Sequence, residues 1–291
     1  MADIHTSIAI DTGLFDYWPA PAKLNLMLRI VGRRPDGYHL LQTVFQLLDI
    51  GDRVGFRIRQ DGRIRRANAL PGVPEEHDLT IRAAKLLQRH CVTALGVDIH
   101  LEKCLPMGAG LGGGSSDAAT TLLVLNRLWS CRCTGDQLAD LGLTLGADVP
   151  VFIRGRSSWG EGIGEKLEPL ELPCPWYLIL VPPCHVATAE IFSDPDLTRN
   201  SPRIKIRDFL AGSVQNDCLS VVCRRYPPVQ EAIRWLGRFS SPRLTGTGAA
   251  VYASFESEAR ARQVYKQVPD RYRSFIARGM NRSPVAAESV S

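Results

Sequence analysis

Residues 106–117 of the chain read PMGAGLGGGSSD, with five glycines in the seven positions from Gly108 to Gly114. Glycine has no side chain to keep a ligand away from the backbone, and it adopts positive φ without strain, so several N–H groups can point into one concavity. A following helix, capped by Ser115 or Ser116, is indicated by apolar residues at helical spacing: Ala118, Ala119, Leu122, Leu123 and Leu128. Because a helix N-terminus attracts anions, the segment predicts a phosphate-binding loop.

Two other kinds of glycine loop compete with this interpretation. Gly108, Gly110 and Gly113 match G-x-G-x-x-G, which is typical of dinucleotide-binding enzymes such as dehydrogenases. The acidic residue expected at the end of the next strand is missing, since Asp136 stands at a helix start after Thr134. The NTPase P-loop does not fit either, because no Lys-Ser/Thr follows the glycines. We therefore expect ATP phosphates in the loop, with Ser115 and Ser116 able to bond them or to approach Mg²⁺.

The bulk composition favours an ordinary globular protein. The 291 residues are 45% apolar and 22% charged, and they suffice for one large domain or two medium ones. We find no apolar run near the ~20 residues of a membrane span and no signal-peptide pattern, so we expect a cytoplasmic protein without a membrane partner. The eight cysteines form no C-x-x-C pair, and we expect reduced thiols.

The net charge of +5 is modest. The basic clusters near residues 33–34, 63–66 and 224–225 are not interleaved with aromatic residues and no nucleic-acid motif surrounds them, so we expect no nucleic-acid partner. An RNA-binding protein that uses these clusters remains an alternative, and absent retention on RNA at low ionic strength would exclude it.

Alternating apolar residues from Leu24 to Ile30 predict a half-buried strand, with Lys23 and Asn25 side by side on the face away from the core. Residues 1–17 show no period and are expected to be a loose tail. Periodicity predicts further strands at 54–58, after a turn at 49–52, and at 97–101, 176–181 and 251–255. It predicts helices at 79–91, after Thr134, at 229–238 and at 258–268, and a glycine-rich turn at 245–248. This mixture favours an α+β fold over a doubly wound sheet, with a boundary near Ser157.

With these motifs in place, the chain resembles the GHMP small-molecule kinases. The resemblance rests on five segments between Trp18 and Pro284: 21–26 continuing to 34–39, 106–117, 145–150, 161–165 and 244–249. It implies a two-domain α+β fold with the active site in the interdomain cleft. The N-terminal, ATP-binding GHMP kinase domain would span 1–157 and the C-terminal GHMP kinase domain 158–291.

The segments Asp36-Gly37-Tyr38-His39 and Gly146–Pro150 are similar to one group within this family. That group uses ATP to phosphorylate the 2-hydroxyl of 4-diphosphocytidyl-2-C-methyl-D-erythritol in non-mevalonate isoprenoid biosynthesis. The resemblance therefore implies ATP and Mg²⁺ as cofactors and a small cytidyl diphosphate alcohol as substrate. It leaves the direct Mg²⁺ ligand and the oligomeric state open. A homoserine or mevalonate-pathway kinase and a non-catalytic nucleotide-binding protein remain alternatives.

By motif position, the resemblance makes Asp148 the general base and Lys23 its charged partner. Substrate binding would fall to Asn25, Tyr38, His39, Thr188, Phe192, Thr245 and Gly246, with Tyr38 and Phe192 on either side of the cytosine and His39 on its polar edge. ATP binding would fall to Asp78, Lys103, Pro106, Met107, Gly108, Ala109, Gly110, Leu111, Gly112, Gly113, Gly114, Ser115 and Ser116.

The chain departs from the family pattern at three places. Asp78 stands where related sequences usually carry Asn beside the adenine. Gly160 replaces a more usual Ala before Glu161. The leader before Trp18 is longer than usual, which leaves the physiological start open.

Overall fold

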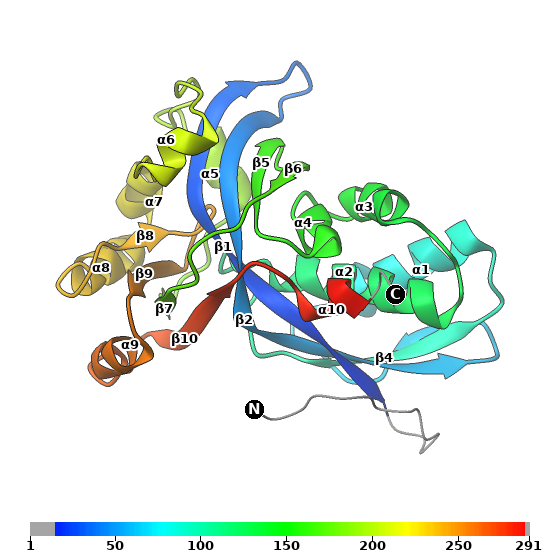
Figure 1. The fold of residues 1–291 in the computed structure, drawn as a ribbon. Helices are drawn as coiled ribbons and strands as arrows, with labels where there is room; N and C mark the ends of the chain where they lie inside the picture. The colour runs from blue at the N-terminus through cyan, green and yellow to red at the C-terminus, as the bar shows by residue number, and fades with distance from the viewer. Residues whose placement is uncertain (1–14, 289–291) are drawn as a thin grey trace.

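The computed structural model describes residues 15–288, and the first fourteen residues of the expected tail lie outside this range. Two long antiparallel strands, β1 (Asp16–Arg33) and β2 (His39–Arg59), run through the middle of the molecule (Figure 1). The strand predicted from Leu24 to Ile30 is confirmed as part of β1. The tail prediction is wrong for Asp16 and Tyr17, which begin that strand.

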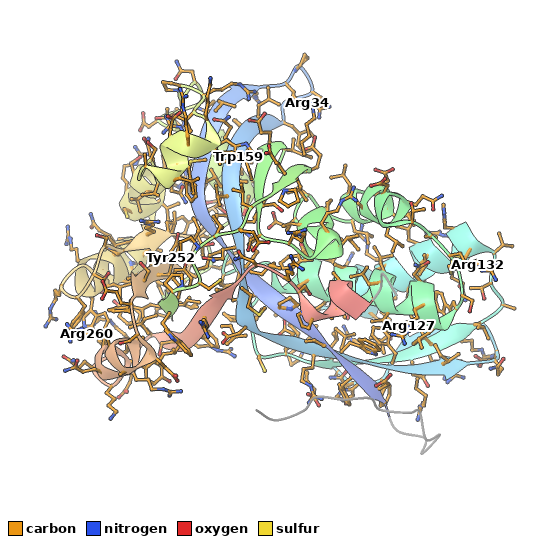
Figure 2. All side chains as sticks on the ribbon, viewed as in Figure 1. Arg34, Arg127, Arg132, Trp159, Tyr252 and Arg260 are labelled. Carbon is orange, nitrogen blue, oxygen red and sulfur yellow. A yellow bond between two sulfur atoms is a disulfide. The ribbon has the colours of Figure 1, made fainter. Side chains whose placement is uncertain are left out.

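The turn expected at 49–52 is also wrong, because β2 continues through it. Asp52 pairs with Ala20 of β1 in the strand register. Gly51 pairs with Pro21 of β1, where a Cβ would clash with the Ala20 carbonyl oxygen, and the Asp49 carboxylate accepts a hydrogen bond from the Arg278 N–H. Figure 2 shows Arg34 at the far end of this hairpin, where the chain turns from β1 into β2.

The remaining strands extend the sheet on both sides of β2. The hydrogen-bonded order is β3-β4-β2-β10-β7-β9-β8, with β1, β5 and β6 joined off this path. Of the described pairs, β3 with β4 is parallel and the others are antiparallel, so the expected α+β class is confirmed over a doubly wound sheet. The strands are β3 (Ile64–Arg66), β4 (Gly96–Glu102), β5 (Ser158–Gly162), β6 (Lys166–Pro169), β7 (Trp176–Val181), β8 (Arg243–Leu244), β9 (Val251–Phe255) and β10 (Arg273–Met280).

One group of helices covers the β4 end of the sheet (Figure 1). It consists of α1 (Leu79–Cys91), α2 (Gly113–Leu128), α3 (Gly135–Leu143), α4 (Val149–Arg154) and, at the C-terminus, α10 (Pro284–Glu288), with the 3-10 turn η1 (Glu75–His77) before α1. Fully buried Ile81, Leu87 and Leu122 belong to one core cluster with Phe56 of β2. Burying side chains of this size stabilises each by about 1.5–3 kcal/mol, so α1 and α2 are fixed by packing on the sheet.

A second group of helices lies against β7 and β9. It consists of α5 (Thr188–Ser193), α6 (Ile206–Leu210), α7 (Leu219–Arg225), α8 (Pro227–Leu236) and α9 (Glu258–Tyr265). Its core joins Val222, Val229 and Leu236 to Leu180 and Val251 of the strands. The sequence predicted the positions of α8, α9, β7 and β9, and the structure confirms them.

Several element boundaries differ from the prediction for local reasons. Helix α2 begins at Gly113, not at the serines, because Gly112 takes a left-handed conformation just before it. Thr134 does cap α3, since its hydroxyl accepts from the Gln137 N–H and the Gln137 side chain returns a bond to the Thr134 N–H. Strand β10 and helix α4 were not predicted.

The cysteine prediction is wrong at one pair. Cys91 and Cys131 are joined by a disulfide, with their Cα atoms 5.4 Å apart. They are 40 residues apart in sequence, and they meet because α1 and α2 pack together and end at the same side of the molecule. The Cys133 sulfur lies 3.9 Å from that of Cys91. Within residues 15–288 we find no helix long and apolar enough to cross a membrane.

Candidate active site

Lys23 and Asp148 form an ion pair, with Nζ of the lysine 3.1 Å from Oδ2 of the aspartate. Lys23 comes from the middle of β1, and Asp148 precedes α4. Although Asp148 occupies the N-cap position of that helix, its side chain makes no capping hydrogen bond, so the carboxylate is available to the lysine. The Asp148 side chain is 36% exposed whereas that of Lys23 is 4% exposed, so one end of the pair is open to a ligand.

Lys23 and Asn25 are buried, which corrects the prediction that they lie on an open strand face. The backbone N–H of Lys23 donates to the carbonyl of Leu111 in the glycine loop, 3.0 Å away, and the loop covers that face of β1. Because Leu111 is 88 positions away in sequence, the alternation around Lys23 could not indicate this burial. The burial matters chemically, because ionic interactions are stronger where water is excluded.

A directional chain of hydrogen bonds holds the lysine in place. Lys23 Nζ donates to Asn25 Oδ1 at 2.6 Å, and Asn25 Nδ2 donates to Thr43 Oγ1 at 2.9 Å. The Thr43 hydroxyl in turn donates to the Met27 carbonyl at 2.7 Å. Lys23 can only donate and the Met27 carbonyl can only accept, so the direction of each bond between them is fixed. The orientation of the Asn25 amide is therefore set, and the ammonium is held beside Asp148.

The glycine loop lies against the turn 245–248 and needs its glycines to do so. Gly108, Gly110 and Gly112 have φ of 68°, 79° and 76°. A Cβ on Gly110 would lie 2.6 Å from the Thr245 carbonyl oxygen, and one on Gly112 would lie 3.1 Å from Lys23 Cε. These close approaches bring the backbone of the glycine loop within contact of Lys23 and of the turn.

Thr245 links this loop to the strand that carries the lysine. Its Oγ1 accepts from the Asn25 N–H at 3.0 Å and donates to the Gly110 carbonyl at 3.3 Å. Tyr252 of β9, seen near the strand crossing in Figure 2, donates its buried hydroxyl to the Asn25 carbonyl at 3.1 Å. Gly246 approaches the same asparagine, because a Cβ there would lie 3.3 Å from Asn25 Oδ1. Thr245 and Gly246 therefore contact the residues expected to bind substrate.

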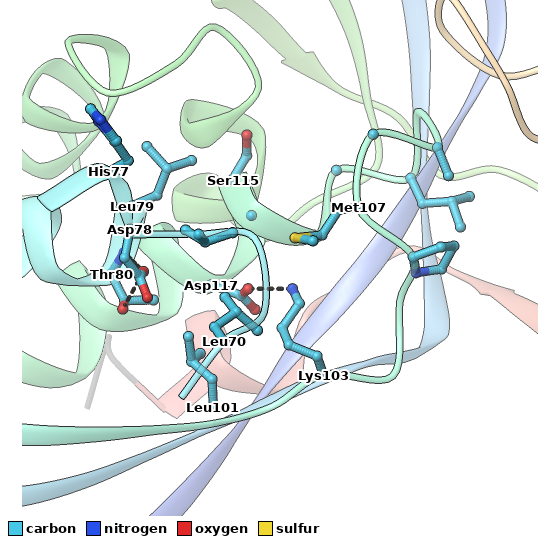
Figure 3. A pocket seen from close by; sticks show the side chains of 18 of the residues that line it. Leu70, His77, Asp78, Leu79, Thr80, Leu101, Lys103, Met107, Ser115 and Asp117 are labelled. Atoms are coloured by element: carbon cyan, nitrogen blue, oxygen red, sulfur yellow. Dashed lines mark hydrogen bonds and ion pairs between the residues drawn. The ribbon is translucent and has the colours of Figure 1, made fainter. Parts of the chain in front are cut away.

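A cavity of about 350 Å³ opens beside the loop (Figure 3). Most of the residues expected to bind ATP line it: Asp78, Lys103, Pro106, Met107, Gly108, Ala109, Gly110, Leu111, Gly112, Gly113, Gly114 and Ser115. Ser116 does not line the cavity. Its Oγ is buried at the start of α2 and has no hydrogen-bond partner within the described residues. Leu70, Leu79 and Leu101 provide apolar surface, so the cavity combines an apolar part with a backbone loop suited to anions.

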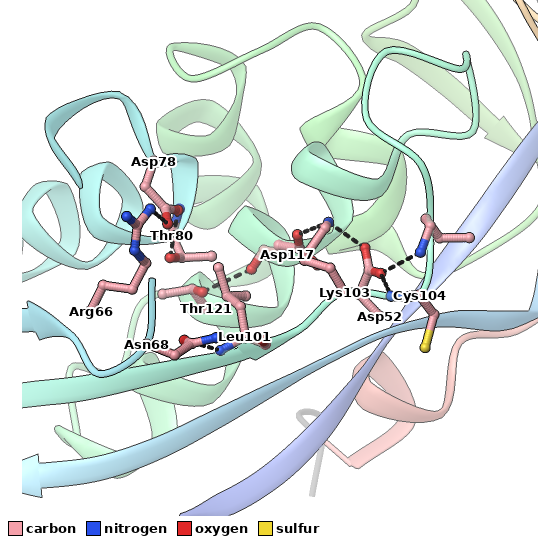
Figure 4. Close-up of polar contacts among 11 residues, drawn as sticks. Asp52, Arg66, Asn68, Asp78, Thr80, Leu101, Lys103, Cys104, Asp117 and Thr121 are labelled. Atoms are coloured by element: carbon pink, nitrogen blue, oxygen red, sulfur yellow. Dashed lines mark hydrogen bonds and ion pairs between the residues drawn. The ribbon is translucent and has the colours of Figure 1, made fainter. Parts of the chain in front are cut away.

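Two buried carboxylates share the ammonium of Lys103 (Figure 4). Lys103 Nζ donates to Asp117 Oδ2 at 2.6 Å and also to Asp52 Oδ2. Asp52 further accepts the backbone N–H groups of Cys104 and Leu105 at 2.6 and 2.8 Å, which anchors the segment leading into the glycine loop. Burial, together with the nearby Asp52 charge, raises the pKa of Asp117 to about 7 against the opposing effect of Lys103.

Asp78 carries a charge at a place where the chain was expected to depart from the family pattern, and that charge is matched. Arg66 Nη1 lies 3.0 Å from Asp78 Oδ2, and both side chains are buried. The other oxygen of Asp78 accepts from the N–H and the hydroxyl of Thr80, at 2.9 and 2.7 Å. The carboxylate therefore caps α1 and pairs with Arg66 while it lines the cavity. Its contact with adenine stays a prediction.

A second cavity, of about 530 Å³, contains the residues expected to bind the cytidyl group: Tyr38, His39, Thr188 and Phe192. Phe192 stacks on His39, with ring centroids 4.9 Å apart and planes 23° from parallel, while Tyr38 is 61% exposed. Thr188 Oγ1 lies 2.8 Å from Thr247 Oγ1, next to the turn that contacts the glycine loop. Ala147 also lines this cavity, directly before Asp148. The Lys23–Asp148 pair therefore lies between the two cavities.

Several residues that complete these sites were not predicted from the sequence: Thr43, Asp52, Arg66, Asp117 and Arg199. Asp117 stands in the quoted loop, and Thr43 lies in a stretch of β2 that is buried on both faces and does not alternate. Nothing local marks Asp52, Arg66 or Arg199, because their partners are distant in sequence.

Family profiles match both halves of the chain. The profile described as GHMP kinases N terminal domain matches residues 78–156, and that described as GHMP kinases C terminal matches residues 206–274. The first contains the helix cap Asp78, the glycine loop and Asp148, so it covers most of the residues that line the first cavity.

Curated relatives match nearly the whole chain. A protein of Pseudomonas savastanoi pv. phaseolicola, named 4-diphosphocytidyl-2-C-methyl-D-erythritol kinase, is 56% identical over 90% of this chain and 91% of its own. The protein of the same name from Methylococcus capsulatus is 58% identical over 92% of each chain.

A solved structure titled as 4-(cytidine 5'-diphospho)-2C-methyl-D-erythritol kinase superposes with a TM-score of 0.79. It is 31% identical and covers 91% of this chain and 99% of its own. Because these curated relatives are 56–58% identical over nine tenths of the chain, the chain belongs to the 4-diphosphocytidyl-2-C-methyl-D-erythritol kinase family of the GHMP kinases.

Proposed function

We propose that the protein transfers the γ-phosphoryl group of ATP to the 2-hydroxyl of 4-diphosphocytidyl-2-C-methyl-D-erythritol, giving the 2-phosphate and ADP. The relatives bear the name of this kinase over nine tenths of the chain. The observation that carries the proposal is the position of the Lys23–Asp148 ion pair between a glycine-loop cavity and a second cavity.

In this proposal Asp148 accepts the proton of the attacking hydroxyl. An alcohol is a weak nucleophile near neutral pH, and a carboxylate within hydrogen-bond reach removes its proton as the oxygen–phosphorus bond forms. Lys23 lowers the energy of the negative oxygen that develops, and its hydrogen bond to Asn25 and its ion pair with Asp148 spare reorganisation at that moment. The bond between the γ-phosphorus and its bridging oxygen breaks, and ADP leaves.

The glycine loop would hold the phosphates of ATP through its N–H groups, and Lys103 would add positive charge at the same cavity. Mg²⁺ neutralises phosphate charge in such transfers and binds through few protein oxygens plus the phosphates. Residues 15–288 contain no cluster of three or more His, Cys, Asp or Glu side chains suited to a metal. Asp117 lines this cavity and its Oδ1 has no hydrogen-bond partner among the described residues, so we propose that it would hold Mg²⁺ delivered with ATP.

The cytidyl group would occupy the second cavity, with the rings of Tyr38 and Phe192 against the base, His39 on its polar edge, and Asn25 and Thr188 along the path to Asp148. Stacking of a base on an aromatic ring is worth ~1–3 kcal/mol. The cytoplasmic location expected from the sequence suits an enzyme that consumes ATP, and it stays a prediction.

A coupled ADP-release assay with purified protein and Mg·ATP tests the substrate. We expect turnover with the cytidyl diphosphate alcohol and background rates with homoserine and mevalonate. Turnover confined to alcohols without a cytidyl group would assign the protein to another GHMP activity. ATP binding without turnover of any of these alcohols would support the non-catalytic alternative.

A further inference from the structure

Arg199 joins the two sides of the second cavity. It lies in the loop after α5, and its guanidinium makes four hydrogen bonds. Nε donates to His39 Nε2 at 3.2 Å, while Nη1 and Nη2 donate to the carbonyls of Leu197 at 3.0 Å, Phe192 at 2.9 Å and Asp194 at 2.7 Å. No carboxylate pairs with Arg199 within residues 15–288, although exposed arginines of the neighbouring α7 each pair with Asp194. Three carbonyls and one imidazole therefore hold the guanidinium in its orientation.

The contact with His39 fixes the state of its ring. Arginine has donors and no acceptor, so His39 Nε2 must be the unprotonated nitrogen that accepts. In a neutral imidazole the proton then resides on Nδ1. Nδ1 has no hydrogen-bond partner among the described residues, and His39 lines the second cavity. A free N–H donor therefore remains on a residue that borders the expected base site.

The surroundings of His39 also favour the neutral ring. Burial lowers its pKa, and the positive charges of Arg199 and Arg33 lower it further. Arg33 ends β1 opposite His39, Phe192 covers one face of the ring, and Tyr38 precedes it in the chain. The nearest turn carboxylate, Asp36, pairs with Arg34 at 2.7 Å.

We propose that Arg199 is a positioning residue that makes His39 a hydrogen-bond donor toward the substrate base and so selects cytosine. The proposal rests on the cytidyl substrate of the proposed function and deepens it. The pairing edge of cytosine carries the acceptors N3 and O2, and because uracil also carries O2, the selection comes from donation by Nδ1–H to N3. Uracil carries an N3–H at the same place, and two donors facing each other leave both unpaired. Buried polar sites discriminate strongly on this basis.

The same guanidinium places Phe192. By binding its carbonyl, Arg199 ties the end of α5 to the start of β2, so that the aromatic ring and the imidazole are held 4.9 Å apart. One side chain thus sets both the ring that would stack on the base and the donor that would read its edge.

Nitrogen-15 NMR of the imidazole groups in the ligand-free protein, with His39 assigned by its absence in His39→Ala, tests the tautomer directly. We expect the Nδ1–H tautomer in the natural protein and a mixture rich in Nε2–H in Arg199→Met. A natural protein with Nε2–H, or an Arg199→Met spectrum identical to it, would overturn the proposal. This measurement needs no substrate, so it stands even if the proposed function fails.

Calorimetric binding of the cytidyl diphosphate alcohol without ATP tests whether Arg199 contributes to binding through His39. At about pH 8, we expect Arg199→Met to bind roughly 10- to 100-fold more weakly, and Arg199→Lys to recover part of the loss. Near pH 6 the variant should regain affinity, because protonation places a hydrogen on Nδ1 whatever the tautomer. The natural protein should show no such gain.

A double-variant comparison separates this role from simple support of the loop. In a His39→Ala background, Arg199→Met should cause a smaller further loss of affinity, the part that comes from its hold on Phe192. The same extra loss in both backgrounds, with no pH-dependent recovery, would show that Arg199 acts on the loop alone. Arg207→Met, whose side chain is 77% exposed, serves as the control and should bind like the natural protein. If the natural protein does not bind the cytidyl alcohol, the proposed function fails, and the NMR result still decides the tautomer.

Discussion

The carboxylate of Asp148 is the residue on which the proposed chemistry depends most. Asp148→Asn keeps the shape of the side chain and removes its ability to accept a proton. We expect kcat to fall by about 10²- to 10⁴-fold, the usual contribution of a general base. ATP affinity should change little, because Asp148 does not line the glycine-loop cavity. Steady-state kinetics with a separate ATP-binding measurement checks both.

Asp136→Asn is the matched control. Asp136 is also an aspartate near the start of a helix, and it pairs with Arg154 at 80% exposure, so its replacement should leave kcat unchanged. Near-normal turnover in Asp148→Asn would remove Asp148 as the base.

At single positions, the sequence predicted which residues form the site better than it predicted their burial and contacts. The Leu24–Ile30 alternation identified the strand, and the motif match selected Lys23, Asn25 and Asp148. Burial of Lys23 and Asn25 was not predictable from the alternation, because the covering loop and turn begin near residues 110 and 245. Arg199 carries no local signal at all, since its meaning comes from His39, 160 positions away.

At the scale of elements, a prediction for the glycine loop separates the cost of a left-handed backbone from the cost of a steric clash. Gly110→Ala adds a Cβ 2.6 Å from the Thr245 carbonyl, at a φ of 79°. Gly72 has a similar φ of 77° with nothing within 4 Å of an added Cβ. Both variants carry the left-handed strain, about 1–2 kcal/mol, and Gly110→Ala alone displaces the loop.

We therefore expect Gly110→Ala to raise KM for ATP at least tenfold and Gly72→Ala to lose stability only. Urea unfolding and ATP kinetics on both variants measure this. Equal effects on ATP kinetics in the two variants would mean that the loop's contact with the 245–248 turn is unimportant.

A further prediction concerns the disulfide, which joins the end of α1 to the segment that follows α2. Closing a loop of 40 residues restricts the unfolded chain and stabilises the fold by roughly 3–4 kcal/mol in the chain-entropy model. A reducing agent should lower the melting temperature of the natural protein. Cys91→Ser should melt at the reduced value under both conditions, whereas Cys174→Ser, a free cysteine, should behave like the natural protein.

Cys131→Ser provides a further check on the geometry. Because the Cys133 sulfur lies 3.9 Å from that of Cys91, we expect this variant to form a Cys91–Cys133 bond, detectable by peptide mass mapping. A natural protein insensitive to reductant would contradict the structural role of the disulfide.

Elements with strong periodicity were predicted well, and those without it were not. The apolar spacing of α1 and the capping residue Thr134 of α3 are local signals, and both were sufficient. Strand β10 alternates weakly and is placed by pairing with β7. Asp49 and Asp52 suggest a turn in isolation, and they lie in a strand only because the Arg278 N–H and Lys103 bind their carboxylates.

For the molecule as a whole, acid unfolding should depend on Asp194. Its side chain binds Arg224 at 2.7 Å and Arg225 at 3.0 Å, which ties the end of α5 to α7. The hydrogen bond from Arg224 holds its pKa at about 2. Since the folded-state pKa lies below the ordinary value, this stabilisation is fully present above about pH 4 and is lost as pH falls toward 2.

Asp194→Asn should therefore be less stable at neutral pH and should lose less stability than the natural protein between pH 4 and 2. Thermal melts across this range provide the measurement. Asp196→Asn, 66% exposed and bound to the same Arg224, is the control and should follow the natural protein. Parallel curves for Asp194→Asn and the natural protein would show that the Arg224 contact does not govern acid unfolding.

At this scale the fold class was predictable from the mixture of strands and helices, and the family resemblance predicted that Lys23, the glycine loop, Asp148 and Thr245 belong to one site. The division of the chain at residues 157 and 158 stays a prediction. The two cavities were not predictable, because each is walled by segments that are far apart in sequence.

Strand β2 carries both His39 and Thr43, and their separation works as a measure of length. Four residues of strand span about 13 Å, and an even number keeps both side chains on one face. His39 borders the expected base site, and Thr43 holds Asn25 beside Lys23. The hairpin thus sets the distance between the base and the reacting hydroxyl. Cytidine diphosphate esters with shorter alcohol arms should occupy the base site, block the enzyme competitively and receive no phosphate.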